Sequence, residues 1–334
     1  MPHYFLGVDI GATKSHALLA DEAGRALGFG QAGPGNPDMI GYVELAELLD
    51  TIIRQSLTAA EISREQIAGA GFGIAGYDWP SQRQPICQAI QSLGLPAPSE
   101  LVNDALIGLL AGAAEGWGVC IIAGTSCNCW GWDRRRRVGR MTGLSALFGE
   151  AAGSGELVMK AMHAVAADWS RRGPATRLTP AFIEVTGAGS IEDLLEGLSQ
   201  ERYRLSASAA PLVFRVAAAG DPVAQSLIEW AGQELGSMAI GVIRQLEFEA
   251  LDFEVVLAGS FYNGSSRLIE VIGETISQVA PGARLVRLTA PPVVGGVLLG
   301  MERAGFNPAP VREALIRSTN ERLQKGNEPF LDEE

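Results

Sequence analysis

Short apolar segments separated by glycine-rich turns dominate the first third of the chain. Their pattern predicts strands over residues 4–9, 15–20 and 26–31, and the short turns between them favour an antiparallel meander. Apolar residues then recur at helical spacing over 42–57, which predicts an amphipathic helix. The remaining elements expected in this part are strands over 67–75 and 100–102 and a helix over 85–93.

The pattern restarts at residue 118. A strand over 118–123, a small-residue turn and a strand over 128–132 repeat the opening arrangement. The elements expected after them are strands over 253–258 and 283–288 and helices over 156–169, 193–198, 209–219, 222–246, 267–279, 293–304 and 310–324. Strand meanders followed by helices, twice over, predict an α/β protein of two similar domains with a cleft between them.

The bulk composition narrows the function classes. A formal net charge of −12 opposes a nucleic-acid partner, because an acidic surface repels the phosphate backbone. No apolar run reaches membrane-spanning length, and cysteines 87, 120, 127 and 129 show no disulfide-framework spacing. We therefore expect a cytoplasmic protein with reduced thiols and no membrane partner. The arginine run at 134–137 favours a solvated turn, while contact with an anionic substrate stays open.

The first turn carries the groups that a polyphosphate needs. The turn Gly11-Ala12-Thr13-Lys14 offers bare backbone N–H groups, a hydroxyl and a cation. Asp9 ends the preceding strand, where a carboxylate beside phosphates makes sense if Mg²⁺ lies between them. An ordinary strand–turn–strand with a capping aspartate is the structural alternative, and it stays open for this segment taken alone.

A second hairpin, and a carboxylate between the two hairpins, strengthen this interpretation. Gly124-Thr125-Ser126 repeats the donor pattern without a charge, so the two turns could clamp the phosphates of one nucleotide from both sides. Asp104 follows the short strand at 100–102 and could accept the proton of an attacking hydroxyl. The alternative, compatible with the first, is that Asn103 or Asp104 N-caps a helix beginning at 105.

Two further glycine sites could place a flat base against bare backbone. Gly259-Ser260 follows a predicted strand, and Gly295 lies in the segment 292–296 that opens a predicted helix. The histidines at 3, 16 and 163 lack the spacing of zinc ligands.

In the order of these motifs, the chain resembles the BadF/BadG/BcrA/BcrD-type ATPase family, and within it the N-acetylglucosamine kinase branch. The matching segments are 7–14 for the first phosphate motif, 122–126 for the second, 256–260 for the adenosine motif, and Asn103-Asp104 for the catalytic aspartate. The resemblance implies two ribonuclease-H-like domains of the actin-like ATPase type. The first domain would span 1–115, and the second would span 116–307 and contain a helical insertion. The last helix, 308–325, would pack on the first domain.

The resemblance also implies a set of site residues. Asp104 would be the catalytic base, and Asp9 with Asp104 would serve Mg²⁺. The expected sugar contacts are Gly35, Asn36, Asn103, Asp104, Thr125, Asn128 and Glu150. The chain departs from the family at 149–155, where Glu150 stands for an aspartate and the second acid of the family motif is missing. These changes bear on the identity of the sugar more than on the ATP site.

The leading interpretation is a kinase that places the γ-phosphate of ATP on a hydroxyl, the 6-hydroxyl by expectation, of N-acetylglucosamine or a related amino sugar. Such an enzyme would use Mg²⁺ and is expected to form a homodimer. One alternative is a partner ATPase of the BadF type, which energises electron transfer and holds an iron–sulfur cluster between subunits. Another is a sugar sensor with weakened catalysis.

Overall fold

The computed structural model describes the backbone of residues 2–326, and their side chains apart from those of residues 145, 146, 325 and 326. This part of the chain divides into two compact units. The first takes the residues up to Cys120, Trp130–Val138 and the residues from Val286 onward, and the second takes Ile121–Cys129 and Gly139–Leu285.

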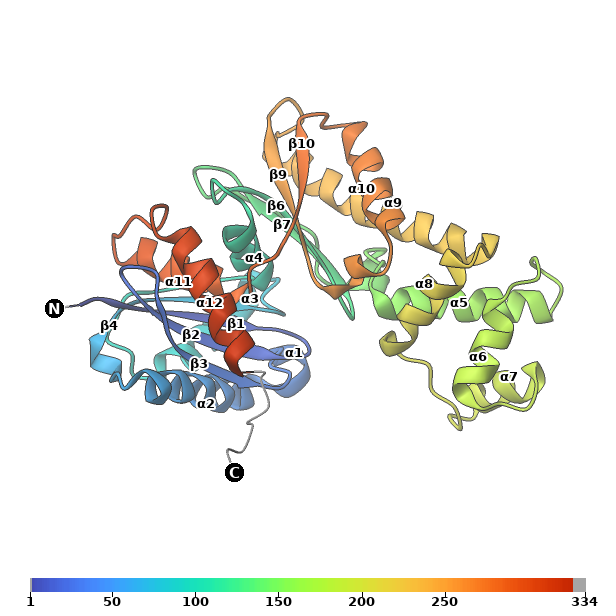
Figure 1. The fold of residues 1–334 in the computed structure, drawn as a ribbon, viewed down its shortest axis with the longest axis horizontal. Coiled ribbons are helices and arrows are strands. Elements are labelled where there is room, and N and C mark those ends of the chain that lie inside the picture. Colours follow the sequence, from blue (N-terminus) through green and yellow to red (C-terminus); the bar gives the residue numbers. More distant parts are fainter. Residues whose placement is uncertain (1, 327–334) are drawn as a thin grey trace. The chain divides into compact units, whose positions relative to one another are not determined.

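The first unit is built on a five-stranded sheet in the order β3-β2-β1-β4-β5 (Figure 1). Its strands are β1 (Tyr4–Ile10), β2 (Ser15–Asp21), β3 (Ala26–Ala32), β4 (Ile67–Ile74) and β5 (Ser99–Val102). Strands β1, β2 and β3 pair antiparallel, which confirms the predicted meander. Strands β1, β4 and β5 run parallel, so their carboxyl ends meet at one edge of the sheet.

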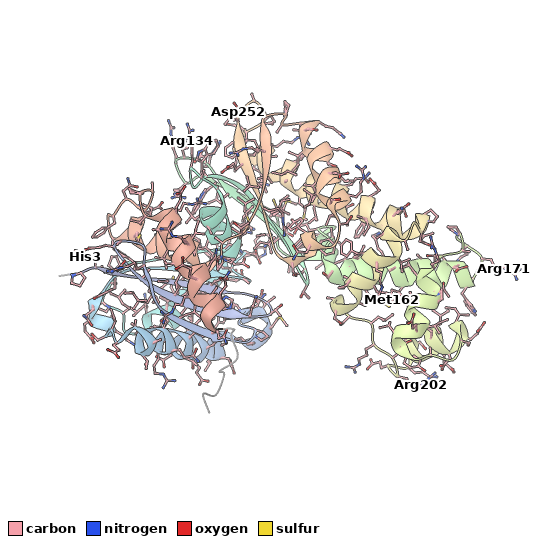
Figure 2. All side chains as sticks on the ribbon, viewed as in Figure 1. His3, Arg134, Met162, Arg171, Arg202 and Asp252 are labelled. Atoms are coloured by element: carbon pink, nitrogen blue, oxygen red, sulfur yellow. The ribbon has the colours of Figure 1, made fainter. Side chains whose placement is uncertain are left out.

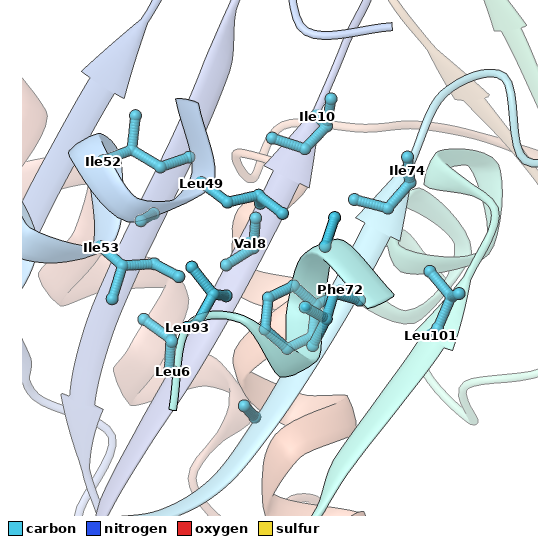
Figure 3. Packing of buried hydrophobic residues seen from close by; sticks show 14 of the residues in the cluster. Leu6, Val8, Ile10, Leu49, Ile52, Ile53, Phe72, Ile74, Leu93 and Leu101 are labelled. Atoms are coloured by element: carbon cyan, nitrogen blue, oxygen red, sulfur yellow. The ribbon is translucent and has the colours of Figure 1, made fainter. Parts of the chain in front are cut away.

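One face of this sheet is covered by α2 (Tyr42–Ala60) and α3 (Pro80–Gln91). Alternate residues of β1 point to this face, because successive side chains of a strand point to opposite sides. They pack with residues of α2 and β4 in one apolar cluster (Figure 3), which includes Leu6, Val8, Ile10, Leu49, Ile52, Ile53, Phe72 and Ile74. Burial of each large side chain contributes about 1.5–3 kcal/mol of transfer free energy.

The other face packs against α11 (Val293–Arg303) through glycines. A Cβ on Gly7 would lie 2.5 Å from the carbonyl oxygen of Val293, and one on Gly71 would overlap the carbonyl oxygen of Gly296. Gly69 meets Gly300 in the same way, farther toward the start of β4. The helix therefore runs antiparallel to β1 and β4, and its N-terminus lies toward their carboxyl ends.

Two more helices begin at this carboxyl edge. The loop after β4 leads into α3, and β5 leads into α4 (Asp104–Gly112) after a single residue. Helix N-termini carry a partial positive charge and favour anions. One edge of the first unit thus combines the ends of three parallel strands with the N-termini of three helices.

The compact units divide the chain differently from the predicted domains, at 116–120, at Trp130–Val138 and, most extensively, at the C-terminal end. Residues 286–307 were assigned to the second domain, but the chain from Val286 onward belongs with the first unit. The glycine contacts of α11 with β1 and β4 explain this grouping. The last helix, α12 (Arg312–Gly326), also lies on this unit, where Ser318 Oγ donates to the carbonyl oxygen of Gly24 at 2.9 Å.

A second five-stranded sheet has the order β10-β9-β6-β7-β8. Its strands are β6 (Gly118–Ala123), β7 (Cys127–Trp132), β8 (Val138–Arg140), β9 (Phe253–Ala258) and β10 (Ala283–Arg287). The helices of the second unit are α5 (Ser154–Trp169), α6 (Leu178–Thr186), α7 (Ile191–Ser199), α8 (Ala210–Ala218), α9 (Pro222–Leu246) and α10 (Ser266–Ser277). Helix α9 packs along α10, where Gly232 meets Val271 and Gly236 meets Thr275.

Three helices depart from the sequence prediction. The helix expected to start at Pro85 starts at Pro80, because the Gln82 side chain accepts the backbone N–H groups of Asp78 and Trp79. Helix α6 was not predicted. The N–H of Arg177 just before it donates to Asp221, a residue distant in sequence, while the N–H of Leu178 donates to the nearby Thr176 hydroxyl at 3.2 Å. A four-residue helix, α1 (Pro37–Ile40), was also missed.

Within residues 2–326, no helix combines the length and the apolar character needed to cross a membrane.

The glycine packing of α11 makes a testable prediction. We expect Gly71→Ala to lower the free energy of unfolding by about 3 kcal/mol, because the new methyl group would lie 2.8 Å from Leu299 Cβ. Gly33→Ala is the matched control, since a Cβ there has no atom within 4 Å. Urea denaturation monitored by circular dichroism measures both. Equal midpoints for the two variants would contradict the close packing.

Candidate functional site

The first hairpin follows β1 and exposes the groups expected for phosphate. Gly11 N–H donates to the carbonyl oxygen of Lys14 at 3.1 Å and closes the turn. The side chains of Thr13 and Lys14 are exposed, while Asp9 at the end of β1 is largely buried. The hairpin therefore presents a hydroxyl and an ammonium group outward, with a carboxylate at its base.

The loop after β3 is tied to this hairpin. Gly35 N–H donates to the carbonyl oxygen of Gly11 at 3.0 Å. Next to it, Asn36 Oδ1 accepts the N–H of Asp38 at 2.9 Å and caps α1. The Asn36 carboxamide lies against Gly76, where a Cβ would be 2.9 Å from Asn36 Cγ. The predicted sugar loop and the predicted phosphate turn thus belong to one connected structure.

Asp104 stands at the N-terminus of α4, next to other carboxylates. Asn103 caps this helix, because its Oδ1 accepts the N–H of Ala105 at 3.0 Å. Burial raises the pKa of Asp104 well above its ordinary value of 3.8, and the neighbouring carboxylates of Asp9 and Asp78 raise it further. The backbone N–H groups of Ala105 and Asp104 act in the opposite direction. This carboxyl group is therefore a stronger proton acceptor when ionised than an ordinary aspartate.

Asp78 is a site residue that the sequence analysis missed. It is 8% exposed, and its Oδ1 accepts an N–H of Asn103 Nδ2 at 3.2 Å. Asn103 Nδ2 also donates to the carbonyl oxygen of Tyr77, so both of its N–H donors are used. Its position in the sequence could have identified it. Asp78 comes shortly after β4, Asp9 lies near the end of β1, and these parallel strands end at the same edge of the sheet.

The second hairpin, in the second unit, turns its carbonyl groups toward α5. The N–H groups of Ser154 and Gly155 donate to the carbonyl oxygens of Gly124 at 2.8 Å and Thr125 at 3.0 Å. These first-turn N–H groups lack partners within the helix, and the hairpin satisfies them. The side chains of Thr125 and Ser126 are exposed. The hairpin is thus fixed from one side and keeps its hydroxyl groups at the surface.

Glu150 is held by backbone amides. Its Oε1 accepts the N–H of Thr142 at 2.7 Å and its Oε2 that of Gly143 at 2.9 Å, and the residue is 4% exposed. The Cys127 thiol donates to the carbonyl oxygen of Glu150 at 3.4 Å. Burial raises the pKa of Cys127 to about 12, so this thiol stays protonated. The altered stretch at 149–155 therefore has a defined structural role.

The two predicted adenosine glycines have different surroundings. Gly259 has φ 111° and lies against the end of β6, where a Cβ would be 2.8 Å from the carbonyl carbon of Ala123. Gly259 and Ser260 are exposed beside the second hairpin. Gly295 is buried, and a Cβ there would be 2.7 Å from the carbonyl carbon of Ile107 in α4. Protein backbone fills the space where the base was expected, so Gly295 packs helices together instead.

The arginine run lies in the turn between β7 and β8, where side-chain contacts hold two of the arginines. Figure 2 marks Arg134 on this turn. Its guanidinium lies 4.7 Å from the centroid of the Trp117 ring and pairs with Glu115 at 2.8 Å. Arg136 lies over Trp132 and pairs with Glu302 at 2.6 Å. The run is a solvent-exposed turn, and stacking and ion pairs hold two of its arginines.

The predicted site residues fall into two groups, one in each unit. The first unit brings together Asp9, Gly11, Ala12, Thr13, Lys14, Gly35, Asn36, Asn103 and Asp104, and adds Asp78. The second unit carries Gly124, Thr125, Ser126, Asn128, Glu150, Gly259 and Ser260. Within it, Asn128 is half-buried, and its Oδ1 accepts the N–H of Cys129 at 2.8 Å.

The model of the BadF/BadG/BcrA/BcrD ATPase family matches residues 6–300 of the chain. The N-acetylmuramic acid/N-acetylglucosamine kinase of Clostridium acetobutylicum is 24% identical over 298 residues, which are 89% of this chain and 97% of the relative.

Two solved structures show the same fold. One, from Chromobacterium violaceum, is assigned as an N-acetylglucosamine kinase and has a TM-score of 0.67 at 20% identity, covering 89% of this chain and 98% of its own. The other is a ROK family glucokinase from Streptomyces griseus in complex with glucose and AMPPNP. It has a TM-score of 0.58 at 17% identity and covers 90% of this chain and 100% of its own. The predicted fold of the actin-like ATPase type is confirmed.

The raised pKa of Asp104 makes a prediction about stability and pH. Ionisation of Asp104 is less favourable in the folded chain than in the unfolded one, so its charge destabilises the fold as the pH rises above 3.8. We expect Asp104→Asn to raise the melting temperature of the protein in EDTA. The gain should be absent below pH 3.8, should grow as the pH rises from 3.8 towards the raised pKa of Asp104, and should stay constant above it. Glu47→Gln, on the exposed side of α2, should give no such gain. A constant difference across the pH range would contradict the assignment.

Proposed function

Because the chain belongs to the BadF/BadG/BcrA/BcrD ATPase family, we propose that it is an ATP-dependent kinase for N-acetylglucosamine or a related amino sugar. The acceptor in this proposal is the 6-hydroxyl group. The observation that carries it is Asp104, a carboxyl group of raised pKa at a helix N-terminus, beside the carboxylate at the base of the glycine hairpin.

Asp104 is the catalytic base in this reaction. The sugar hydroxyl oxygen attacks the γ-phosphorus, its bond to ADP breaks, and the hydroxyl proton passes to the Asp104 carboxylate. A general base works best when its pKa approaches the working pH, and the raised pKa of Asp104 supports this role. Phosphoryl transfer needs little further covalent chemistry, so the remaining residues position the reactants and stabilise charge.

Each unit, taken by itself, contributes candidate contacts for the nucleotide. In the proposal, Gly11-Ala12-Thr13-Lys14 binds phosphate through backbone N–H groups, the Thr13 hydroxyl and the Lys14 ammonium group. Thr125 and Ser126 supply exposed hydroxyls from the second hairpin. The exposed Gly259 and Ser260 lie against the adenosine.

The carboxylates of the first unit fit Mg²⁺ delivered with the nucleotide. Asp9 and Asp78 lie close enough to Asp104 to raise its pKa. Carboxylate oxygens are the ligands that a hard cation such as Mg²⁺ prefers. Mg²⁺ is usually bound by one or two carboxylates together with phosphates and water. We propose Asp9 and Asp104 as its protein contacts. The ion would neutralise phosphate charge.

For the sugar we propose contacts from Asn36, Thr125 and Asn128. For Glu150, which is 4% exposed and accepts two backbone N–H groups, we propose that it positions the loop at 142–150. Asn36 uses its Oδ1 in the cap of α1 and offers its Nδ2 as a donor. Asn103, expected as a contact, is 1% exposed with both N–H donors used, which supports a positioning role. The Clostridium acetobutylicum relative is named for two N-acetylated amino sugars, which supports this substrate class.

The buried cysteines argue against the partner-ATPase alternative. Cys120, Cys127 and Cys129 are buried, and burial raises the pKa of Cys120 and Cys127. An iron–sulfur cluster needs thiolates that can reach it, which these residues do not supply.

For the working form of the enzyme we propose a cytoplasmic homodimer.

The test is the sugar dependence of ADP release from MgATP. We expect release with N-acetylglucosamine or N-acetylmuramic acid and only a trace without sugar. Asp104→Asn should lower kcat by about 10²–10⁴-fold, the usual contribution of a general base, because the neutral amide cannot take the proton. Glu47→Gln is the control and should match the unaltered protein.

The other outcomes separate the alternatives. Equal ADP release with and without sugars would overturn the kinase in favour of an ATPase. Sugar binding seen by calorimetry without any ADP release would point to a sensor.

A further inference from the structure

A buried histidine nitrogen beside the first hairpin lacks a hydrogen-bond partner. His16 Nδ1 is buried and makes no hydrogen bond within the described part of the chain. An unpaired buried polar atom of this kind costs about 1–3 kcal/mol, so a fold retains it only where something else needs it. The ring itself is held by packing, since it lies 5.2 Å from the Phe29 ring at an interplanar angle of 37°.

The atom that faces His16 Nδ1 belongs to Asp9. The two residues are direct cross-strand partners in the antiparallel β1–β2 pair. Both project from the sheet face that packs on α11, since Phe5 of β1 and Leu18 of β2, on the same alternation, belong to the cluster that includes Val293 of that helix. Asp9 Oδ2 lies 3.9 Å from His16 Nδ1, which is beyond hydrogen-bond length.

Both side chains are shielded from water. The Asp9 side chain is 14% exposed and that of His16 is 16% exposed. The pair is therefore assembled but not yet hydrogen-bonded.

We propose that His16 is a positioning residue that donates its Nδ1–H to Asp9 Oδ2 when Mg²⁺ and the nucleotide are bound. The inference rests on the proposed function, which makes Asp9 a contact of the ion. Carboxylates that serve a metal are commonly oriented by such a second hydrogen bond, whose loss costs 10–100-fold in metal affinity. The bond fixes the Asp9 rotamer and satisfies the unpaired nitrogen at the same time. Arrival of the ligand thus removes the cost carried by the free protein.

Three substitutions separate this role from packing. His16→Phe keeps a ring against Phe29 and removes the donor. His16→Asn places an amide nitrogen at the position of Nδ1, while His16→Gln places it near that of Nε2. The measurement is calorimetric titration with ADP, once with excess Mg²⁺ and once with EDTA, so that binding is recorded without turnover.

We expect His16→Phe and His16→Gln to weaken Mg²⁺-dependent ADP binding by about 10-fold, and His16→Asn to stay within about 3-fold of the unaltered protein. Binding in EDTA should be the same for all four proteins. Equal losses for Phe and Asn, losses that persist in EDTA, or no loss in any variant would each overturn the positioning role. If the unaltered protein fails to bind ADP with Mg²⁺, the proposed function itself is wrong, a result distinct from these.

Discussion

The close approach of α11 to β1 and β4 is the constraint on which the first unit depends. Glycines on both sides let strand and helix backbones touch, as at Gly7 and Val293 or Gly71 and Gly296. This contact fixes the direction of the helix, so that its N-terminus lies at the edge where β1, β4 and β5 end. The same edge receives the starts of α3 and α4. Packing in the core therefore determines where backbone N–H groups and carboxylates meet.

That edge combines favourable and unfavourable electrostatics. Helix N-termini stabilise anions, whereas Asp9, Asp78 and Asp104 repel one another, and burial raises the pKa of Asp104 above that of a free aspartate. Active sites commonly hold such perturbed groups at a cost in stability. A nucleotide and its cation would relieve the repulsion. The His16 nitrogen next to Asp9, which lacks a hydrogen-bond partner, is a further unfavourable feature of the same edge.

Much of the fold could be predicted from the sequence because its signals are local. The meander at β1–β3, the hairpin at Gly11 and the cap of α9 at Asp221 all depend on neighbours within a few residues. The start of α6 was not predicted, and it depends in part on Asp221, far along the chain, which accepts the N–H of Arg177.

In the candidate site, too, residues in local motifs could be predicted, and residues that depend on distant contacts could not. Its hairpins and Asp104 follow from short motifs. Gly295 was misjudged, because the group that fills its space, Ile107, comes from another helix. Asp78 was missed and Asn103 was taken for a sugar contact, because their pairing is visible only once β4 and β5 lie side by side.

In the proposed reaction, the carboxylate edge of the first unit directs phosphate to a sugar rather than to water. Phosphorus–proton correlation NMR on the products of MgATP and N-acetylglucosamine distinguishes the two acceptors. We expect one sugar phosphate for each ADP formed, with the phosphorus coupled to the protons on carbon 6. ADP accompanied by inorganic phosphate, with the sugar unmodified, would contradict it.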